Sequence, residues 1–277
     1  MHTLPESAPA RTAPVGGAPN RELPFYLPVG HEEKIFLAAH RNKQPVMLKG
    51  PTGCGKTRFI EYMAAKMNRP LITVSCNEDT TATDLLGRHL FQGGDTVWSD
   101  GPLTRGVRQD AIVYLDEIAE ARADAMVAIH PLTDYRRELF LDRTSETLRA
   151  GEGFMLVVSY NPGYQKSLRE LKPSTRQRFV GLTFDYPEED QEADIVAAET
   201  GIDRKTAQTL VKMARKIRGM HELSLLESAS TRLLIAAARL IAAGLPPRLA
   251  CFSALAEPLT DDVDARAALK HWIDISI

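Results

Sequence analysis

The sequence predicts an α/β domain with a five-stranded parallel sheet flanked by helices, followed by a small all-helical domain. Between residues 25 and 186, five short apolar runs are separated by helical patterns. None of these runs alternates strictly between apolar and polar residues, which is typical of parallel strands covered on both faces. After Pro187 the sequence shows helical patterns only, which indicates a second domain over residues 187–277.

The elements of the first domain follow from its apolar runs and turn signals. The expected strands are PVMLK at 45–49, LITVS ending at Ser75, AIVYL at 111–115, FMLVVS at 154–159 and VGLTF at 180–184. Two stretches with hairpin signals are expected as insertions near residues 87–100 and 138–150. In the first of them, the turn signal GGD separates two apolar pairs that include Phe91 and Trp98.

The second domain is expected to consist of five helices. They are predicted at 188–200, 203–218, 228–243, 247–257 and 262–274. Asp203 is a favourable residue to begin the second of these helices, and Gly244 is a favourable residue to end the third. Residues 1–24 are rich in proline and alanine and have few large apolar side chains, so we expect a disordered N-terminal tail.

Composition excludes several classes of protein. The formal net charge of −2 and the sequence pI of about 6.4 disfavour a protein that binds nucleic acid, because such proteins usually carry a basic excess. The cysteines, Cys54, Cys76 and Cys251, are odd in number and lack C-x-x-C spacing, which disfavours disulfides and zinc. The longest apolar stretch, Leu233 to Leu245, is too short to span a bilayer. We therefore expect a cytoplasmic protein without a membrane span.

One motif predicts a nucleotide-binding loop. The stretch GPTGCGKT matches G-x-x-x-x-G-K-[ST] in full, directly after an expected strand and before the helical stretch Arg58 to Met67. Backbone N–H groups of such a loop surround phosphates, Lys56 reaches the β and γ phosphates of ATP, and Thr57 ligates Mg²⁺. The cofactor-binding residues are expected to be Gly50, Pro51, Thr52, Gly53, Cys54, Gly55, Lys56 and Thr57.

Two further strand ends carry polar residues that suit the same site. Asp116 and Glu117 follow an apolar strand, and we expect Asp116 to hold Mg²⁺ and Glu117 to polarise an attacking water. Asn161 follows the next strand along the chain and could position that water, although an Asn-Pro pair is also a common turn. Ligands of parallel sheets bind at the carboxyl ends of strands, which favours the functional interpretation.

These motifs resemble those of the AAA+ ATPases, and within them the MoxR group, over about residues 25–277. The resemblance makes Gly50–Thr57 the Walker A motif, residues 112–117 the Walker B motif and Asn161 the sensor 1 residue. It also makes Arg232, in SASTRLL, the sensor 2 arginine. The stretch KPSTRQRFV has two arginines with no acidic residue within five positions, which taken alone could be a solvated surface. In AAA+ proteins the arginine finger comes from this position, so Arg178 is expected to reach a neighbour's nucleotide and Arg176 is a second candidate.

The stretches LTDYRREL, FMLVVSYNPGYQ and LKPSTRQRF most closely resemble the CbbQ/NorQ/GvpN branch, and CbbQ in particular. The resemblance implies a homo-hexameric ATPase that acts with an adaptor containing a von Willebrand factor A domain. CbbQ proteins act as rubisco activases and NorQ proteins mature nitric oxide reductase, and rubisco is the favoured client. In MoxR-like proteins the first insertion projects toward the central pore, whereas the alternative is that Phe91 and Trp98 pack on their own domain.

Two other functions remain open from the sequence. A nucleotide-dependent switch would bind ATP without sustained turnover, but it would have no need of a carboxylate such as Glu117. A metabolic kinase also uses a phosphate-binding loop, but it would need an acceptor pocket and would need no arginine from a neighbouring subunit.

Overall fold

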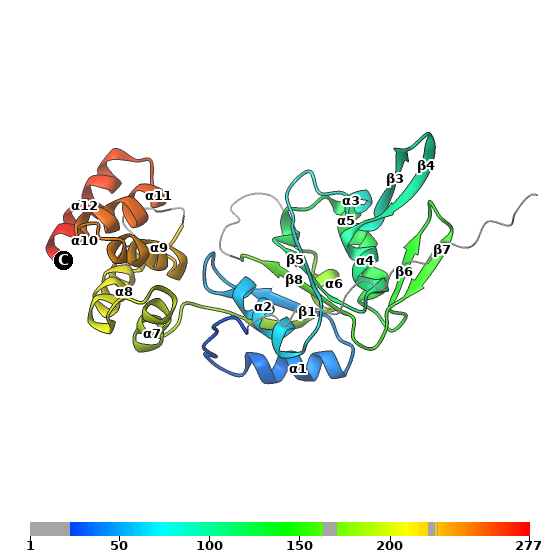
Figure 1. Ribbon diagram of the computed structural model, residues 1–277, viewed down its shortest axis with the longest axis horizontal. Coiled ribbons are helices and arrows are strands. Elements are labelled where there is room, and N and C mark those ends of the chain that lie inside the picture. The colour runs from blue at the N-terminus through cyan, green and yellow to red at the C-terminus, as the bar shows by residue number, and fades with distance from the viewer. Residues whose placement is uncertain (1–22, 163–170, 221–224, 226) are drawn as a thin grey trace, which may run out of the picture.

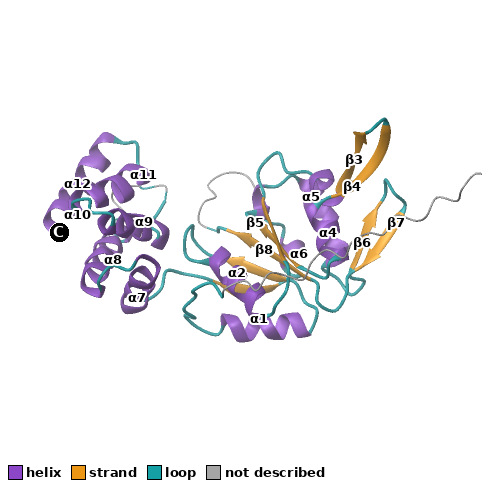
Figure 2. Cartoon of the chain, in the orientation of Figure 1, coloured by secondary structure: helices purple, strands orange, loops and turns teal. Residues whose placement is uncertain are grey.

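A computed structural model describes residues 23–162, 171–220, 225 and 227–277. The expected disordered tail at 1–24 lies outside the described residues up to residue 22. The chain forms an α/β part followed by a helical part, drawn in Figure 1 by chain position and in Figure 2 by secondary structure.

The α/β part contains a parallel sheet of five strands in the order β2-β5-β8-β1-β9. The strands are β1 (Val46–Lys49), β2 (Leu71–Ser75), β5 (Ile112–Asp116), β8 (Met155–Tyr160) and β9 (Val180–Thr183). All five expected strands are confirmed, with ends that differ by at most one residue. The adjacent strands β1, β8 and β5 place their carboxyl ends side by side at one edge of the sheet.

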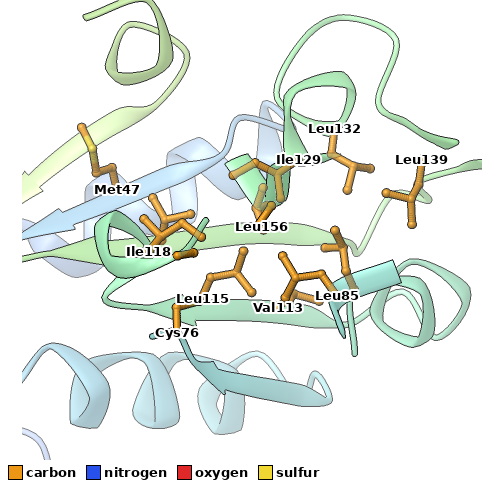
Figure 3. Close-up of a cluster of buried hydrophobic side chains, with 14 of the residues drawn as sticks. Met47, Cys76, Leu85, Val113, Leu115, Ile118, Ile129, Leu132, Leu139 and Leu156 are labelled. Atoms are coloured by element: carbon orange, nitrogen blue, oxygen red, sulfur yellow. The ribbon is translucent and has the colours of Figure 1, made fainter. Parts of the chain in front are cut away.

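The two faces of the sheet bury separate clusters of apolar side chains. On one face, Met47, Val113 and Leu156 pack with Leu85 and Ile129, as Figure 3 shows. On the other face, the alternate residues of the same strands pack against α1 (Glu32–Arg41) and α2 (Lys56–Lys66). Successive side chains of a strand point to opposite faces, so two covered faces require apolar residues at every position. This explains why the apolar runs do not alternate.

The remaining helices of the α/β part are short and connect the strands. They are α3 (Ala82–Leu86), α4 (Pro102–Arg108), η1 (Ile118–Glu120), α5 (Ala123–Ile129), η2 (His130–Leu132) and α6 (Pro173–Arg176). The last of these includes part of the stretch KPSTRQRFV, for which the sequence predicted no helix. Thr175, within α6, is buried, and its Oγ1 forms a hydrogen bond with His130 Nε2 at 3.2 Å.

Both insertions form antiparallel hairpins at the end of the α/β part that lies away from the helical part (Figure 1). The first pairs β3 (Gly87–Gln92) with β4 (Asp95–Asp100), and the second pairs β6 (Glu138–Leu141) with β7 (Glu146–Arg149). Phe91 is 80% exposed, whereas Trp98 packs against the core and donates its Nε1–H to Asp100 at 2.7 Å. The two aromatic side chains therefore have different environments, one projecting and one packed.

The helical part consists of α7 (Glu189–Thr200), α8 (Arg204–Arg218), α9 (Thr231–Ala242), a run from α10 (Pro247–Cys251) through η4 (Phe252–Ala256) to α11 (Glu257–Leu259), and α12 (Val263–Ser276). Its own apolar core includes Leu210, Leu234 and Leu255. The helix expected at 228–243 begins at Thr231, because the Ser230 hydroxyl caps it by accepting from Leu233 N. Among the described helices, none has the length and apolar character needed to cross a membrane.

Candidate nucleotide site

The glycine-rich loop joins β1 to α2 at the carboxyl edge of the sheet. Lys56, the first residue of α2, donates from Nζ to Gly50 O at 2.7 Å and to Pro51 O at 2.9 Å. These contacts hold its ammonium group against the backbone carbonyl groups at the start of the loop. Gly53 has a φ of +70°, and a Cβ added to it would lie 2.6 Å from Ser230 Cβ. Glycine at this position therefore allows both the turn and the close approach of the helical part.

Asn161 lies between the glycine-rich loop and the end of β5, because β8 is the strand between β1 and β5. Its side-chain Nδ2 donates to Thr52 Oγ1 at 3.2 Å. The amide is therefore in contact with the loop that is expected to surround the phosphates. Whether Asn161 acts on a water stays a prediction, and the position agrees with that role.

Asp116 is held at the end of β5 by hydroxyl groups. Its Oδ1 accepts hydrogen bonds from Tyr114 OH at 2.7 Å and from Ser159 Oγ, whereas its Oδ2 accepts from Thr57 Oγ1 at 3.4 Å. One carboxylate oxygen is thus anchored and the other is directed toward Thr57. A hydroxyl and a carboxylate oxygen this close suit Mg²⁺, which prefers oxygen ligands and takes few from protein when nucleotide phosphates supply the others. The residues present therefore fit the metal.

Glu117 turns the chain sharply after the strand. Its φ of +54° lies in the left-handed region that non-glycine residues seldom adopt, and its backbone N–H donates to Ser159 Oγ at 3.0 Å. Burial raises the pKa of its carboxyl group, and the charges of Asp116 and Glu120 raise it further. A strained residue with a raised pKa, beside a phosphate-binding loop, has the features expected of a group that accepts a proton from water.

The sequence did not single out Tyr114 or Ser159, which orient the Asp116 carboxylate. Ser159 is fully buried and joins Asp116 to the Glu117 backbone. It is a polar residue within the otherwise apolar run FMLVVS, and this was the available signal. Tyr114 lies two residues before Asp116 and therefore on the same face of β5.

A cleft of about 1070 Å³ lies between the two parts of the chain, and Asn161 is not among the described residues that line it. The cleft contains much of the glycine-rich loop together with Asp116 and Glu117. Arg232, the second residue of α9, also lines it from the helical part. Tyr186, in the segment between β9 and α7, lines it as well and was not singled out from the sequence.

Arg176 and Arg178 do not lie among the described residues that line this cleft. They precede β9, which begins beside the first residue of β1, whereas the glycine-rich loop follows the last residue of β1. The two arginines are thus at the amino edge of the sheet, opposite the cleft of their own chain. Arg178 is also not isolated in space, because its NH1 lies 3.8 Å from Asp134 Oδ2.

Family models match both parts of the chain. Residues 45–179 match the AAA domain (dynein-related subfamily), and residues 192–276 match the CbbQ/NirQ/NorQ C-terminal domain.

Curated relatives match over nearly the whole chain. The denitrification regulatory protein NirQ of Pseudomonas aeruginosa is 58% identical, with 92% of this chain and 98% of the relative covered. Protein NorQ of Paracoccus denitrificans is 56% identical, with coverage of 90% and 92%. Protein CbbQ of Hydrogenophilus thermoluteolus is 53% identical, with coverage of 90% and 94%.

Solved structures with the same fold are more distant in sequence. RuvB of Thermotoga maritima aligns with a TM-score of 0.52 at 16% identity, covering 89% of this chain and 71% of that chain. An ATPase of Cytophaga hutchinsonii aligns with a TM-score of 0.51, also at 16% identity, covering 90% of each chain. At this identity the likeness concerns the fold alone.

Proposed function

This chain belongs to the CbbQ/NirQ/NorQ family of AAA ATPases, and we propose that it forms a ring that hydrolyses ATP to remodel a protein client. One observation carries the catalytic part of the proposal. The Thr57 hydroxyl and the Asp116 carboxylate lie 3.4 Å apart beside the glycine-rich loop, and Glu117 follows directly. A protein that only bound ATP would not need this third group.

The roles of the residues follow from the chemistry of phosphoryl transfer, which depends mainly on positioning and on charge neutralisation. Lys56 and the loop amides would bind the phosphates. Thr57 and Asp116 would hold Mg²⁺, which neutralises phosphate charge when bound. Glu117 would take a proton from the attacking water, Asn161 would position that water, and Arg232 would contact the nucleotide from the helical part.

The position of Arg178 supports the proposed ring. This arginine lies at the edge of the sheet opposite its own cleft, so it is suited to the nucleotide of a neighbouring copy. We propose a homo-hexamer with Arg178 as the finger and Arg176 as a second cation. The family resemblance further supports an adaptor with a von Willebrand factor A domain.

The client is proposed from the relatives. Two relatives carry names from denitrification, at 58% and 54% identity, and NorQ is 56% identical, compared with 53% for CbbQ. This small difference in sequence identity favours nitric oxide reductase as the client, whereas the resemblance of the sequence motifs alone favoured rubisco. Rubisco activation, by release of inhibitory sugar phosphates, is therefore the second candidate.

A reconstitution with both clients tests the proposal. The chain, its adaptor, Mg²⁺ and ATP are incubated in parallel with inactive nitric oxide reductase and with rubisco blocked by a tight sugar phosphate. Recovery of nitric oxide reduction alone supports the first client, and recovery of carboxylation alone supports the second. The chain without ATP is the control. If the chain hydrolyses no ATP in either mixture, the ATPase proposal itself is wrong.

A further inference from the structure

We propose that Tyr186 is a positioning residue that fixes the glycine-rich loop at Thr52 and ties that loop to the helical part. In this arrangement, the contact from Tyr186 and the contact from Asn161 support the same residue and are energetically coupled. The inference rests on the proposed function only in taking ATP as the ligand of the cleft.

Tyr186 contacts the loop through a hydrogen bond. Its hydroxyl donates to the backbone carbonyl of Thr52 at 3.0 Å. Burial raises the pKa of this phenol to about 12, so it stays protonated and able to donate at neutral pH. Tyr186 belongs to neither part of the fold, since β9 ends at Thr183 and α7 begins at Glu189. It therefore acts from the connection between them.

Thr52 also accepts a hydrogen bond from Asn161. The Asn161 amide donates to the Thr52 side chain at 3.2 Å, whereas the Tyr186 hydroxyl donates to the Thr52 backbone. A residue from the end of β8 and a residue from the interdomain connection thus restrain one residue of the loop. If either contact is lost, Thr52 can move, and the remaining contact then restrains it less effectively.

The aromatic ring of Tyr186 stacks on the guanidinium group of Arg218, which is held by hydrogen bonds of its own. The guanidinium carbon of Arg218, at the end of α8, lies 3.9 Å from the ring centroid. Arg218 donates from NH1 and NH2 to the two carboxylate oxygens of Glu192, at 2.7 and 2.6 Å, and from Nε to Ala229 O at 2.7 Å. Each of its three nitrogens thus donates to an acceptor, so the guanidinium group has little freedom to move away from the ring.

Glu192 extends this network into α9. Its carboxylate is fully buried and also accepts a hydrogen bond from Thr231 Oγ1 at 2.6 Å. Thr231 is the first residue of α9 and follows Ser230, the residue that lies against Gly53. The network therefore contacts the glycine-rich loop at two neighbouring residues, at Thr52 through Tyr186 and at Gly53 through Ser230. Removal of one partner from a buried ion pair is strongly destabilising, so the pairing with Glu192 favours the position of Arg218 against the Tyr186 ring.

A purely structural role for Tyr186 would give a different result from a positioning role. A side chain that only packed the two parts together would change the unfolding temperature, and its effect on nucleotide binding would be independent of Asn161. A positioning residue that shares Thr52 with Asn161 should instead show an effect that depends on whether Asn161 is present. A double-mutant cycle measures this dependence.

The experiment uses the full chain and a non-hydrolysable ATP analogue with Mg²⁺, with affinities measured by titration calorimetry. Tyr186→Phe, Asn161→Ala and the double variant are compared with the wild type. Loss of one half-buried hydrogen bond predicts a roughly 2- to 10-fold weaker affinity for Tyr186→Phe, with an unfolding temperature lowered by no more than about 4 °C. We expect the double variant to lose at least about 3-fold less affinity than the product of the two single effects.

Tyr62→Phe is the matched control. Tyr62 lies on α2, its hydroxyl accepts from Lys66 Nζ at 3.0 Å, and it does not line the cleft. Its combination with Asn161→Ala should be multiplicative within about 2-fold. If the wild type binds the analogue but the effects of Tyr186→Phe and Asn161→Ala also multiply, the inference is overturned and the nucleotide site stands. If the wild type does not bind the analogue, the proposed function fails first.

Discussion

The guanidinium group of Arg178 lies 3.8 Å from the carboxylate of Asp134, and Arg136 shares the same carboxylate. Arg136 makes the closer contact, with Nε and NH2 at 3.1 and 2.7 Å from the two Asp134 oxygens. Arg178 has only the longer contact, and its side chain is 37% exposed. Exposed pairs of this kind stabilise a protein by about 0–1 kcal/mol. Arg178 can therefore leave Asp134 at little cost when a phosphate of a neighbouring copy is near.

We predict that Arg178→Ala leaves ATP affinity near normal and lowers the hydrolysis rate by ~10³- to 10⁵-fold, the range for loss of an arginine supplied by a neighbour. Steady-state phosphate release and calorimetric binding measure the two effects. Mixing this variant with Glu117→Gln should restore part of the activity, because some mixed interfaces then combine an intact finger with an intact carboxylate.

Arg204→Ala is the control for this prediction, because Arg204 lies in the helical part and pairs with Asp194 and Asp190 on the surface. It should leave hydrolysis unchanged. Mixtures of Arg178→Ala with Glu117→Gln that remain inactive at every ratio would argue that Arg178 does not act between subunits.

The strands and the positions of the motif residues were predictable because they depend on local sequence. An apolar run covered on both faces and a glycine-rich loop before a helix are local patterns. The ends of parallel strands necessarily meet at one edge, so Asp116 and Asn161 could be assigned to the same site as Lys56 before the strand order was known.

The contacts that orient this site were not predictable, because they join residues distant in sequence. Arg218 on α8 meets Glu192 on α7, and Tyr186, which follows β9, meets Thr52, which follows the adjacent strand β1. No local pattern distinguishes these residues from other polar residues. The absence of an acidic residue within five positions of Arg178 did not reveal its contact with Asp134 for the same reason, since Asp134 is distant in sequence. The start of α9 at Thr231 depends on the capping hydrogen bond of Ser230, which an apolar pattern does not reveal.

Gly53 offers a test of the contact between the loop and the helical part. Gly53→Ala should abolish nucleotide binding or weaken it by at least 10-fold, since the added Cβ would lie 2.6 Å from Ser230 Cβ and would displace either α9 or the loop. Gly201→Ala is the control, because Gly201 has a similar φ of +74° but no atom within 4 Å of the added Cβ. It should cost about 1 kcal/mol of stability and leave affinity unchanged. Equal affinities for the two variants would contradict the close contact.

Phe91 provides a test of how the first hairpin is used. Phe91→Ser should leave the ATPase rate and the unfolding temperature unchanged, because this side chain is 80% exposed, and should reduce client activation in the reconstitution. Val127→Ser is the control, since Val127 is 64% exposed on α5, outside both hairpins. Client activation that survives Phe91→Ser in full would show that this projecting aromatic does not contact the client.

Glu117→Gln separates an ATPase from a nucleotide-dependent switch. The amide keeps the size of the side chain and cannot accept a proton from water, so the hydrolysis rate should fall by ~10²- to 10⁴-fold. Affinity for Mg²⁺-ATP should stay the same or increase, because the variant also removes a negative charge beside Asp116 and the phosphates. Phosphate release and equilibrium binding are measured on the same preparation.

Glu257→Gln is the matched control for Glu117→Gln, since Glu257 is an exposed glutamate that pairs with Arg266 in the helical part. Its hydrolysis rate should equal that of the wild type. Full turnover in Glu117→Gln would assign the base to another group, and the hydrogen bonds of Ser159 would then serve only to orient Asp116. Loss of both turnover and binding would instead mean that Glu117, with its φ of +54°, holds the shape of the strand end. A fall in turnover with retained binding is the outcome expected of a catalytic carboxylate, since only that role separates the two measurements.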